Sequence, residues 1–108
     1  MMKRYGMVIG VRPEKLDEYK RLHAAVWPEI IRLLEEAHVK NYSIFQKDAL
    51  LFGYFEYHGS DLVADFTRMN AEPIVKEWYA VCGPCQVPLA TRKQREWWAD
   101  MDEVFHME

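Results

Sequence analysis

The sequence predicts an α+β fold in the element order βαββαβ, which is the ferredoxin-like arrangement. Two kinds of pattern carry this prediction. Apolar residues alternate with period two over residues 4–11, 41–47 and 50–57, as expected for strands. Runs with helical spacing separate these segments, and each run is interrupted by a proline. At 108 residues the chain is expected to form one domain, residues 1–108.

The first strand, residues 4–11, places four larger apolar side chains on one face and mostly glycine on the other. Pro13 suits the first turn of the helix that follows. That helix continues through Tyr19 and His23. The ring of Pro28 would clash with the carbonyl group four residues earlier, so the helix should bend or stop just after His23. A second helical segment begins at Pro28.

Residues 41–47 and 50–57 predict a hairpin with a short Asp-Ala turn. Both faces of the second strand are apolar or aromatic, whereas a sheet with one wet face alternates more cleanly. The ferredoxin-like order covers only one sheet face with helices. We therefore expect the sheet of a second copy to cover the other face, which makes the protein a homodimer, a dimeric α+β barrel.

The second helical region is predicted to begin at Ser60 as the N-cap. Its buried side is expected to consist of Leu62, Val63 and Phe66. A further helix starts at Pro73. Residues 82–96 then predict a polar, irregular segment, which for so small a domain is typical of a lid or an arm. The last strand is predicted over residues 104–107.

Composition excludes some partners. The net charge is −3 and no basic patch is present, so nucleic acid is not an expected partner. The N-terminal apolar run is too short for a signal or a membrane span, and we expect a cytoplasmic protein that does not contact membranes. Aromatic residues make up 14% of the chain, more than a small core hides easily. An aromatic-lined pocket or a subunit interface is therefore predicted.

Residues 82–85 read CGPC, the sequence of a thioredoxin redox centre. That chemistry needs the first cysteine at a helix N-terminus after a strand, where its pKa is lowered. Here the pair follows a helical run, so we favour a structural turn. A metal site is also not expected, because a second cysteine pair is absent from the sequence and the four histidines are scattered.

His23 is the strongest candidate for chemistry. Tyr19 lies one helical turn earlier on the same face, and Trp27 precedes the proline that stops the helix. An imidazole with a pKa of about 6.5 can both give and take protons at neutral pH. A helix C-terminus favours its cation and burial among aromatic rings disfavours it, and the sequence leaves both possibilities open.

Further aromatic side chains are candidates for a sugar-binding wall. Tyr42 lies on the second strand, and Trp78 and Tyr79 lie on the last helix. Each alone is most simply a packing residue. Together they suit a sugar, because aromatic rings stack on C–H faces while their OH and N–H groups bind hydroxyls.

Four blocks of the chain resemble the L-rhamnose mutarotase family: EYKRLHAAVWPE, NYSIF, EWY and the C-terminal EWWADMDEVFHME. The resemblance covers nearly the whole length. It implies an isomerase without a cofactor or metal that interconverts the α and β anomers of L-rhamnose, and a dimeric ferredoxin-like fold. Carried over by position, the proton donor falls on His23. The sugar-binding residues fall on Tyr19, Tyr42, Trp78 and Tyr79. Many members have Trp-Trp where this chain has Trp78–Tyr79. Tyrosine is smaller and adds a hydroxyl, so the chain could prefer a differently substituted hexose.

Two alternatives use the same fold. Small dimeric ferredoxin-like proteins also include cofactor-free or haem-handling oxygenases, which would use the pocket for an aromatic substrate or a haem. A sugar-binding module without catalysis is the other alternative. It would bind rhamnose without accelerating anomer exchange.

Overall fold

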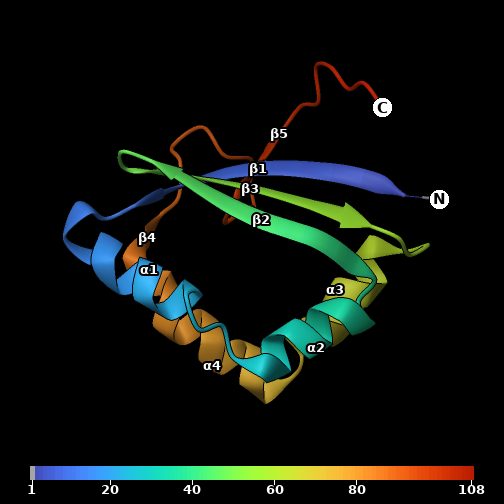
Figure 1. The fold of residues 1–108 in the computed structure, drawn as a ribbon, viewed down its shortest axis with the longest axis horizontal. Helices are drawn as coiled ribbons and strands as arrows, with labels where there is room; N and C mark the ends of the chain where they lie inside the picture. Colours follow the sequence, from blue (N-terminus) through green and yellow to red (C-terminus); the bar gives the residue numbers. More distant parts are fainter. Residues whose placement is uncertain (1) are drawn as a thin grey trace.

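The computed structural model describes residues 2–108 (Figure 1). The strands are β1 (Lys3–Val11), β2 (Val39–Lys47), β3 (Leu50–Tyr57), β4 (Gln86–Val87) and β5 (Ala99–Met101). The helices are α1 (Leu16–His23), α2 (Pro28–Glu36), α3 (Leu62–Asn70) and α4 (Pro73–Cys82), with short 3-10 turns at Pro13–Lys15 and Gly83–Cys85. In the described part of the chain, none of the helices is long and apolar enough to cross a membrane.

The strands form one antiparallel sheet in the order β2-β3-β1-β4, and β5 also pairs with β1. This confirms the predicted ferredoxin-like order. All the helices lie on one side of the sheet (Figure 1). The core lies between these two layers. Its most completely buried side chains are Ile9, Val11, Leu51 and Cys85.

Local sequence rules account for the junctions that the site depends on. Helix α1 ends at His23 and α2 begins at Pro28, as predicted. Trp27, just before the proline, has the extended geometry φ −58° and ψ 130°. The hairpin between β2 and β3 turns at Asp48, which takes a φ of 53° without glycine. Aspartate tolerates this left-handed region better than most residues do.

Two details of α3 correct the sequence prediction. The N-cap is Asp61 rather than Ser60, because the Asp61 carboxylate accepts a hydrogen bond from the backbone N–H of Ala64 at 3.1 Å. Val63 is exposed, so its assignment to the buried side was wrong. Asp65 is buried there instead.

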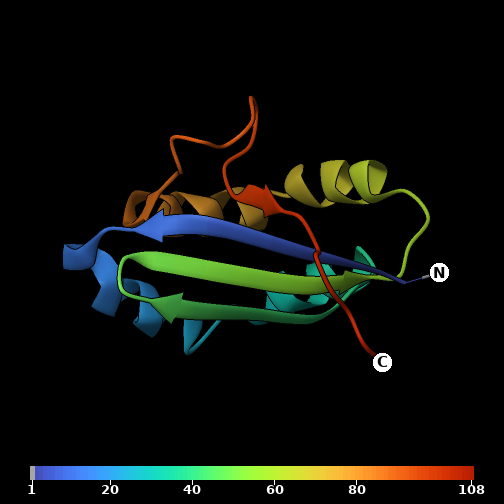
Figure 2. The ribbon, with the colours of Figure 1, turned by 90° about the horizontal axis from the view of Figure 1, so that it is seen from above.

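The C-terminal region differs most from prediction. The last strand is β5, Ala99–Met101, and residues 104–107 form no strand. A strand needs a neighbour with which to pair. Ala99 to Met101 pair with β1, whereas the chain beyond them leaves the sheet, and Val104 and Phe105 are 94% and 78% exposed. Figure 2 shows this tail crossing over the strands, and Figure 1 places it on the side opposite the helices.

Strand β4 was also missed, since Gln86 and Val87 lie in the stretch that was expected to be irregular. The two residues pair with Val11 and Gly10 of β1. A Cβ atom at Gly10 would lie only 2.7 Å from the carbonyl oxygen of Val87, so the glycine is required for this close approach. The pairing matters because it delivers Gln86 to the interior.

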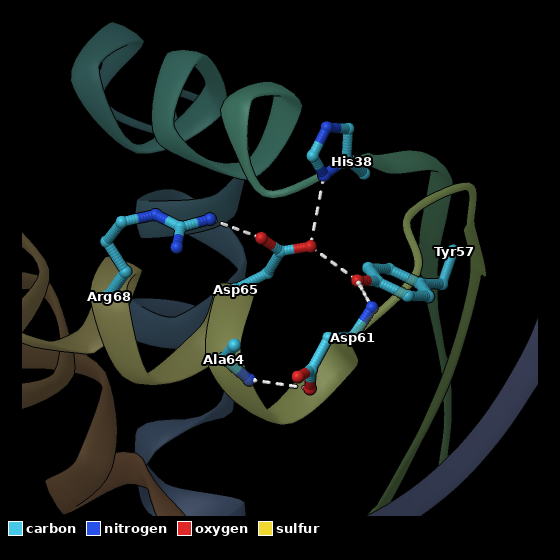
Figure 3. A network of polar contacts seen from close by, with 6 residues as sticks. All are labelled: His38, Tyr57, Asp61, Ala64, Asp65 and Arg68. Carbon is cyan, nitrogen blue, oxygen red and sulfur yellow. Dashed lines mark hydrogen bonds and ion pairs between the residues drawn. The ribbon is translucent and has the colours of Figure 1, made fainter.

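A polar network fixes the end of the molecule where α2 passes into β2 and β3 passes into α3 (Figure 3). The carboxylate of Asp65, on α3, accepts hydrogen bonds from the Tyr57 hydroxyl and from Arg68. It also lies 3.0 Å from Nδ1 of His38. These bonds hold the pKa of Asp65 below its ordinary value, with the Tyr57 bond as the largest cause. The network therefore stabilises three chain segments through one buried carboxylate.

Candidate active site

A cavity of about 640 Å³ opens between the sheet and helices α1, α3 and α4. Its wall is mainly aromatic: Tyr19, Tyr42, Phe55, Phe66, Trp78, Tyr79, Trp97 and Trp98. His23 also lines it. The structure thus brings together all five residues that the sequence analysis selected. They come from α1, β2 and α4.

His23 closes the last turn of α1, and its orientation is fixed by the helix itself. Its Nδ1 atom lies 2.9 Å from the backbone carbonyl oxygen of Tyr19. A carbonyl oxygen can only accept, so Nδ1 carries the proton and donates it to this oxygen. In the neutral ring the lone pair is then on Nε2. The ring of His23 is thus held through Nδ1, and Nε2 takes no part in this bond.

Aromatic rings surround this imidazole. The Tyr19 ring stacks on it, with centroids 4.0 Å apart, and the Trp78 ring meets it edge-on at 5.3 Å. Trp27 in turn packs edge-on against Trp78 at 5.0 Å. Burial among these rings lowers the pKa of His23, and the hydrogen bond to Tyr19 opposes this effect only partly. Of the two possibilities that the sequence left open, burial therefore favours the neutral ring.

The tyrosines of the wall stay protonated. Burial raises the pKa of Tyr19, Tyr42 and Tyr79, so none of them is poised to act as a base at neutral pH. The neighbouring phenols of Tyr19 and Tyr79 further raise the pKa of Tyr42. Tyr42 lies within a β-bulge between Lys40 and Ser43, a device that redirects a side chain.

Comparison with known proteins identifies the family. A family model described as L-rhamnose mutarotase matches residues 4–107. The chain belongs to the L-rhamnose mutarotase family. The L-rhamnose mutarotase of Oceanobacillus iheyensis is 33% identical over 115 residues, covering 99% of this chain and all of the relative. That of Ligilactobacillus salivarius is 32% identical over 113 residues and covers both chains completely.

Solved structures agree with this assignment. The crystal structure of an L-rhamnose mutarotase from Formosa agariphila has a TM-score of 0.75 and 25% identity, covering 98% of this chain and 99% of that one. Tetracenomycin F2 cyclase from Streptomyces glaucescens shares the fold, with a TM-score of 0.69 and 16% identity over 98% of this chain and 99% of that one. As a member of the mutarotase family, the chain is an isomerase.

Three residues that line the cavity were not selected in the sequence analysis: Gln86, Trp97 and Trp98. Gln86 lies within residues 82–96, which were predicted to be irregular, and the two tryptophans follow this segment. The Trp97–Trp98 pair was a usable signal, because two adjacent large aromatic residues beside a polar stretch need somewhere to pack. Gln86 gave no such signal, since its burial depends on the short β4 pairing.

The cysteines are not arranged as a redox pair. Cys82 is the last residue of α4 and Cys85 ends the 3-10 turn that follows, and both are buried, as free thiols. Burial raises the pKa of Cys82 to about 12, and burial together with the Glu18 carboxylate raises that of Cys85. A redox centre needs the opposite shift, toward the thiolate. Within residues 2–108, no three His, Cys, Asp or Glu side chains are grouped so that they could hold a metal ion.

A second cavity of about 690 Å³ adjoins the first, between α2 and β2. Five residues line both cavities and so lie between them: His23, Leu34, Tyr42, Ile44 and Trp78. Only the first cavity also contains Tyr19 and Tyr79 in its lining. We therefore treat the first cavity as the candidate sugar site of this mutarotase.

Proposed function

We propose that this chain interconverts the α and β anomers of L-rhamnose in the aromatic cavity, with His23 as the group that exchanges protons with the sugar. The observation that carries the proposal is the contact of 2.9 Å between His23 Nδ1 and the Tyr19 carbonyl oxygen, which leaves the lone pair of the neutral ring on Nε2. His23 lies at the wall of the cavity that the four other predicted residues also line.

The chemistry needs only proton transfers. Ring opening removes a proton from the anomeric hydroxyl and adds one to the ring oxygen, and the C1–O bond of the ring breaks to give the open-chain aldehyde. Rotation about the C1–C2 bond and reversal of these steps give the other anomer. Positioned acid–base groups typically accelerate such steps by about 10²–10⁴-fold.

Neutral His23 fits both halves of this cycle. Its Nε2 lone pair can accept the proton of the anomeric hydroxyl, and the imidazolium formed can then protonate the ring oxygen. The two oxygens share one carbon, so a single imidazole can reach both. Tyr19 is unsuited to the base role, because burial keeps its phenol protonated.

The remaining wall residues suit a 6-deoxy sugar. The faces of Trp78 and Tyr79 can pack on its C–H groups and its methyl group, while the Tyr42 hydroxyl can bind a sugar hydroxyl. Tyr79 also donates a hydrogen bond to Asn70 Oδ1 at 3.2 Å, which fixes the ring at the cavity wall.

NMR exchange spectroscopy on the anomeric protons of L-rhamnose tests the proposal. Catalytic amounts of the protein should accelerate exchange, and His23→Ala should lower the catalysed rate by at least about 100-fold while the variant stays folded. Wild-type protein without acceleration would defeat the proposed function. Activity retained in His23→Ala would move the acid–base group elsewhere.

The oxygenase alternative receives no support from the family model or the sequence relatives. Among the solved structures, a putative antibiotic biosynthesis monooxygenase from Caulobacter crescentus is only 12% identical and so supports the fold alone. A sugar-binding module would bind L-rhamnose without accelerating exchange, and the same experiment distinguishes it.

The proposal includes a homodimer. Apolar side chains are exposed on the sheet and on the C-terminal tail: Phe45, Met101, Val104, Phe105 and Met107. The tail lies on the side of the sheet that no helix covers (Figures 1 and 2). A second copy packing sheet to sheet would bury both sets, and sedimentation analysis should give twice the chain mass.

The proposed unit is one domain over residues 1–108 that acts on a free monosaccharide. A cytoplasmic location is also part of the proposal. The ordinary globular composition supports it, with 50% hydrophobic and 29% charged residues.

A further inference from the structure

Gln86 connects two walls of the cavity through its side-chain amide. It lies on β4, is only 8% exposed, and lines the cavity. Its Oε1 accepts a hydrogen bond from the indole Nε1 of Trp97 at 2.7 Å. Its Nε2 lies 3.5 Å from the hydroxyl oxygen of Tyr19. The amide therefore joins the segment after β4 to the ring that stacks on His23.

Donor and acceptor rules fix the direction of each bond in this chain. An indole N–H can only donate, so the atom of Gln86 that faces Trp97 must be the carbonyl oxygen. The NH₂ group then has to face Tyr19. An amide NH₂ can only donate, so the Tyr19 oxygen accepts from it. The hydroxyl proton of Tyr19 is left to donate elsewhere, and Tyr19, although only 3% exposed, lines the cavity.

We propose that Gln86 is a positioning residue for anomer exchange: oriented by Trp97, it makes the Tyr19 hydroxyl a hydrogen-bond donor toward an oxygen of the bound sugar. This inference rests on the proposed function and deepens it. A donor at this position complements neutral His23, which presents a lone pair. The sugar thus meets one acceptor and one donor on two rings that stack together.

Substituting Gln86 with glutamate reverses the direction of the hydrogen bond to Tyr19 when the new carboxyl group is ionised. An ionised carboxylate accepts from both Trp97 and Tyr19, which turns the Tyr19 proton away from the sugar. A protonated carboxyl group accepts through its carbonyl and donates through its O–H, as the amide does. Other titratable groups near Tyr19 are His23, Tyr42, Cys82 and Cys85. They are present in both wild type and Gln86→Glu, so the ratio of the two rates isolates the effect of residue 86.

The experiment compares wild type, Gln86→Glu, Gln86→Leu and Trp97→Phe by NMR exchange of L-rhamnose from pH 5 to pH 8. Gln86→Leu should lose at least about 10-fold in catalysed rate, because it leaves the Tyr19 donor unoriented, whereas removing a donor that itself binds the developing charge costs about 10²–10³-fold. Gln86→Glu should be as poor at pH 8, and its rate relative to wild type should rise as the pH falls. Trp97→Phe should lose less, and combining it with Gln86→Leu should add no further loss.

If wild type is active, each outcome either supports or overturns the proposed role of Gln86. A ratio of Gln86→Glu to wild type that stays flat with pH overturns the inference, as does a Gln86→Leu variant with the wild-type rate. The inference is also overturned if the losses in catalysed rate caused by Trp97→Phe and Gln86→Leu are fully additive in the double variant. Should Gln86→Leu fail to fold, the pH-dependent ratio and Trp97→Phe still decide. Inactive wild type would instead defeat the proposed function.

Discussion

Nδ1 of His23 lies 2.9 Å from the backbone carbonyl oxygen of Tyr19, one turn earlier in α1. Helix α1 ends at His23, one turn after Tyr19, and the imidazole folds back onto the Tyr19 carbonyl as a second donor beside the backbone N–H of the helix. A carbonyl oxygen has two lone pairs and can accept both bonds. This local contact selects the imidazole tautomer, and with it the nitrogen that the proposed mechanism uses.

The first prediction concerns the pH dependence of catalysis. Burial holds the pKa of His23 below its ordinary value of about 6.5. Protonation of Nε2 removes the lone pair that starts the cycle. We expect the catalysed exchange rate to be constant at neutral pH and to fall at acid pH, with a midpoint below about 6.5. Proton NMR titration of the His23 ring should give the same midpoint. A midpoint above that value would contradict the assignment of neutral His23.

The second prediction concerns sugar preference. Tyr79 adds a hydroxyl at a position where many members of the family have tryptophan, and this hydroxyl is bonded to Asn70 at the cavity wall. L-mannose differs from L-rhamnose by a hydroxyl on C6, which such a group can bind. Tyr79→Trp should raise the ratio of kcat/KM for L-rhamnose over L-mannose by about 10-fold.

Tyr79→Phe is the matched control for that substitution. It removes the hydroxyl and keeps the ring size, so it separates the polar contribution from the steric one. An equal rise in the ratio for both variants would assign the effect to the hydroxyl. An unchanged ratio in both would show that Tyr79 does not contact the C6 end of the sugar.

Local sequence signals predicted most of the fold. Prolines at 13, 28 and 73 each mark a helix start, and the period-two patterns gave β1, β2 and β3 within a few residues. These signals are local, because proline restricts its own φ and the residue before it. The spacing of Tyr19 and His23 is equally local, which is why it was predictable that the two rings share one helix face.

The errors in the last two strands share one cause. β4 and β5 are two and three residues long, and each exists only because β1 offers it an unpaired edge. The apolar run at residues 104–107 has better strand composition but no partner in the described chain. Pairing of this kind is a long-range property, so the sequence pattern favoured the wrong segment. The role of Gln86 was hidden for the same reason.

The third prediction separates the cysteines from the chemistry. Cys82 lines the cavity and Cys85 is fully buried, and burial keeps both thiols protonated. Replacing both with alanine should leave the catalysed exchange rate within about threefold of wild type, since small buried substitutions act mainly on stability. Dithiothreitol should have no effect on the wild-type rate. A reductant-dependent rate would revive a dithiol function.

The last prediction concerns stability at acid pH and the Asp65 network of Figure 3. The hydrogen bonds from Tyr57, His38 and Arg68 hold the folded pKa of Asp65 below its ordinary value. The unfolded chain has no such bonds, and its Asp65 titrates at about 3.9. The network therefore contributes its full stability above that pH, and the contribution is lost as the pH falls through the lowered folded pKa.

Asp65→Asn should lower the melting temperature by several degrees near pH 7, and the difference from wild type should shrink below about pH 4 as the wild-type carboxylate protonates. Asp102→Asn is the matched control, because Asp102 is exposed in the C-terminal tail, and it should melt like wild type throughout. Neither residue lines the cavity, so both variants should keep the catalysed exchange rate below their melting temperatures. A melting difference for Asp65→Asn that is equally large at pH 3 and pH 7 would show that packing, rather than the charge of Asp65, stabilises this end of the sheet.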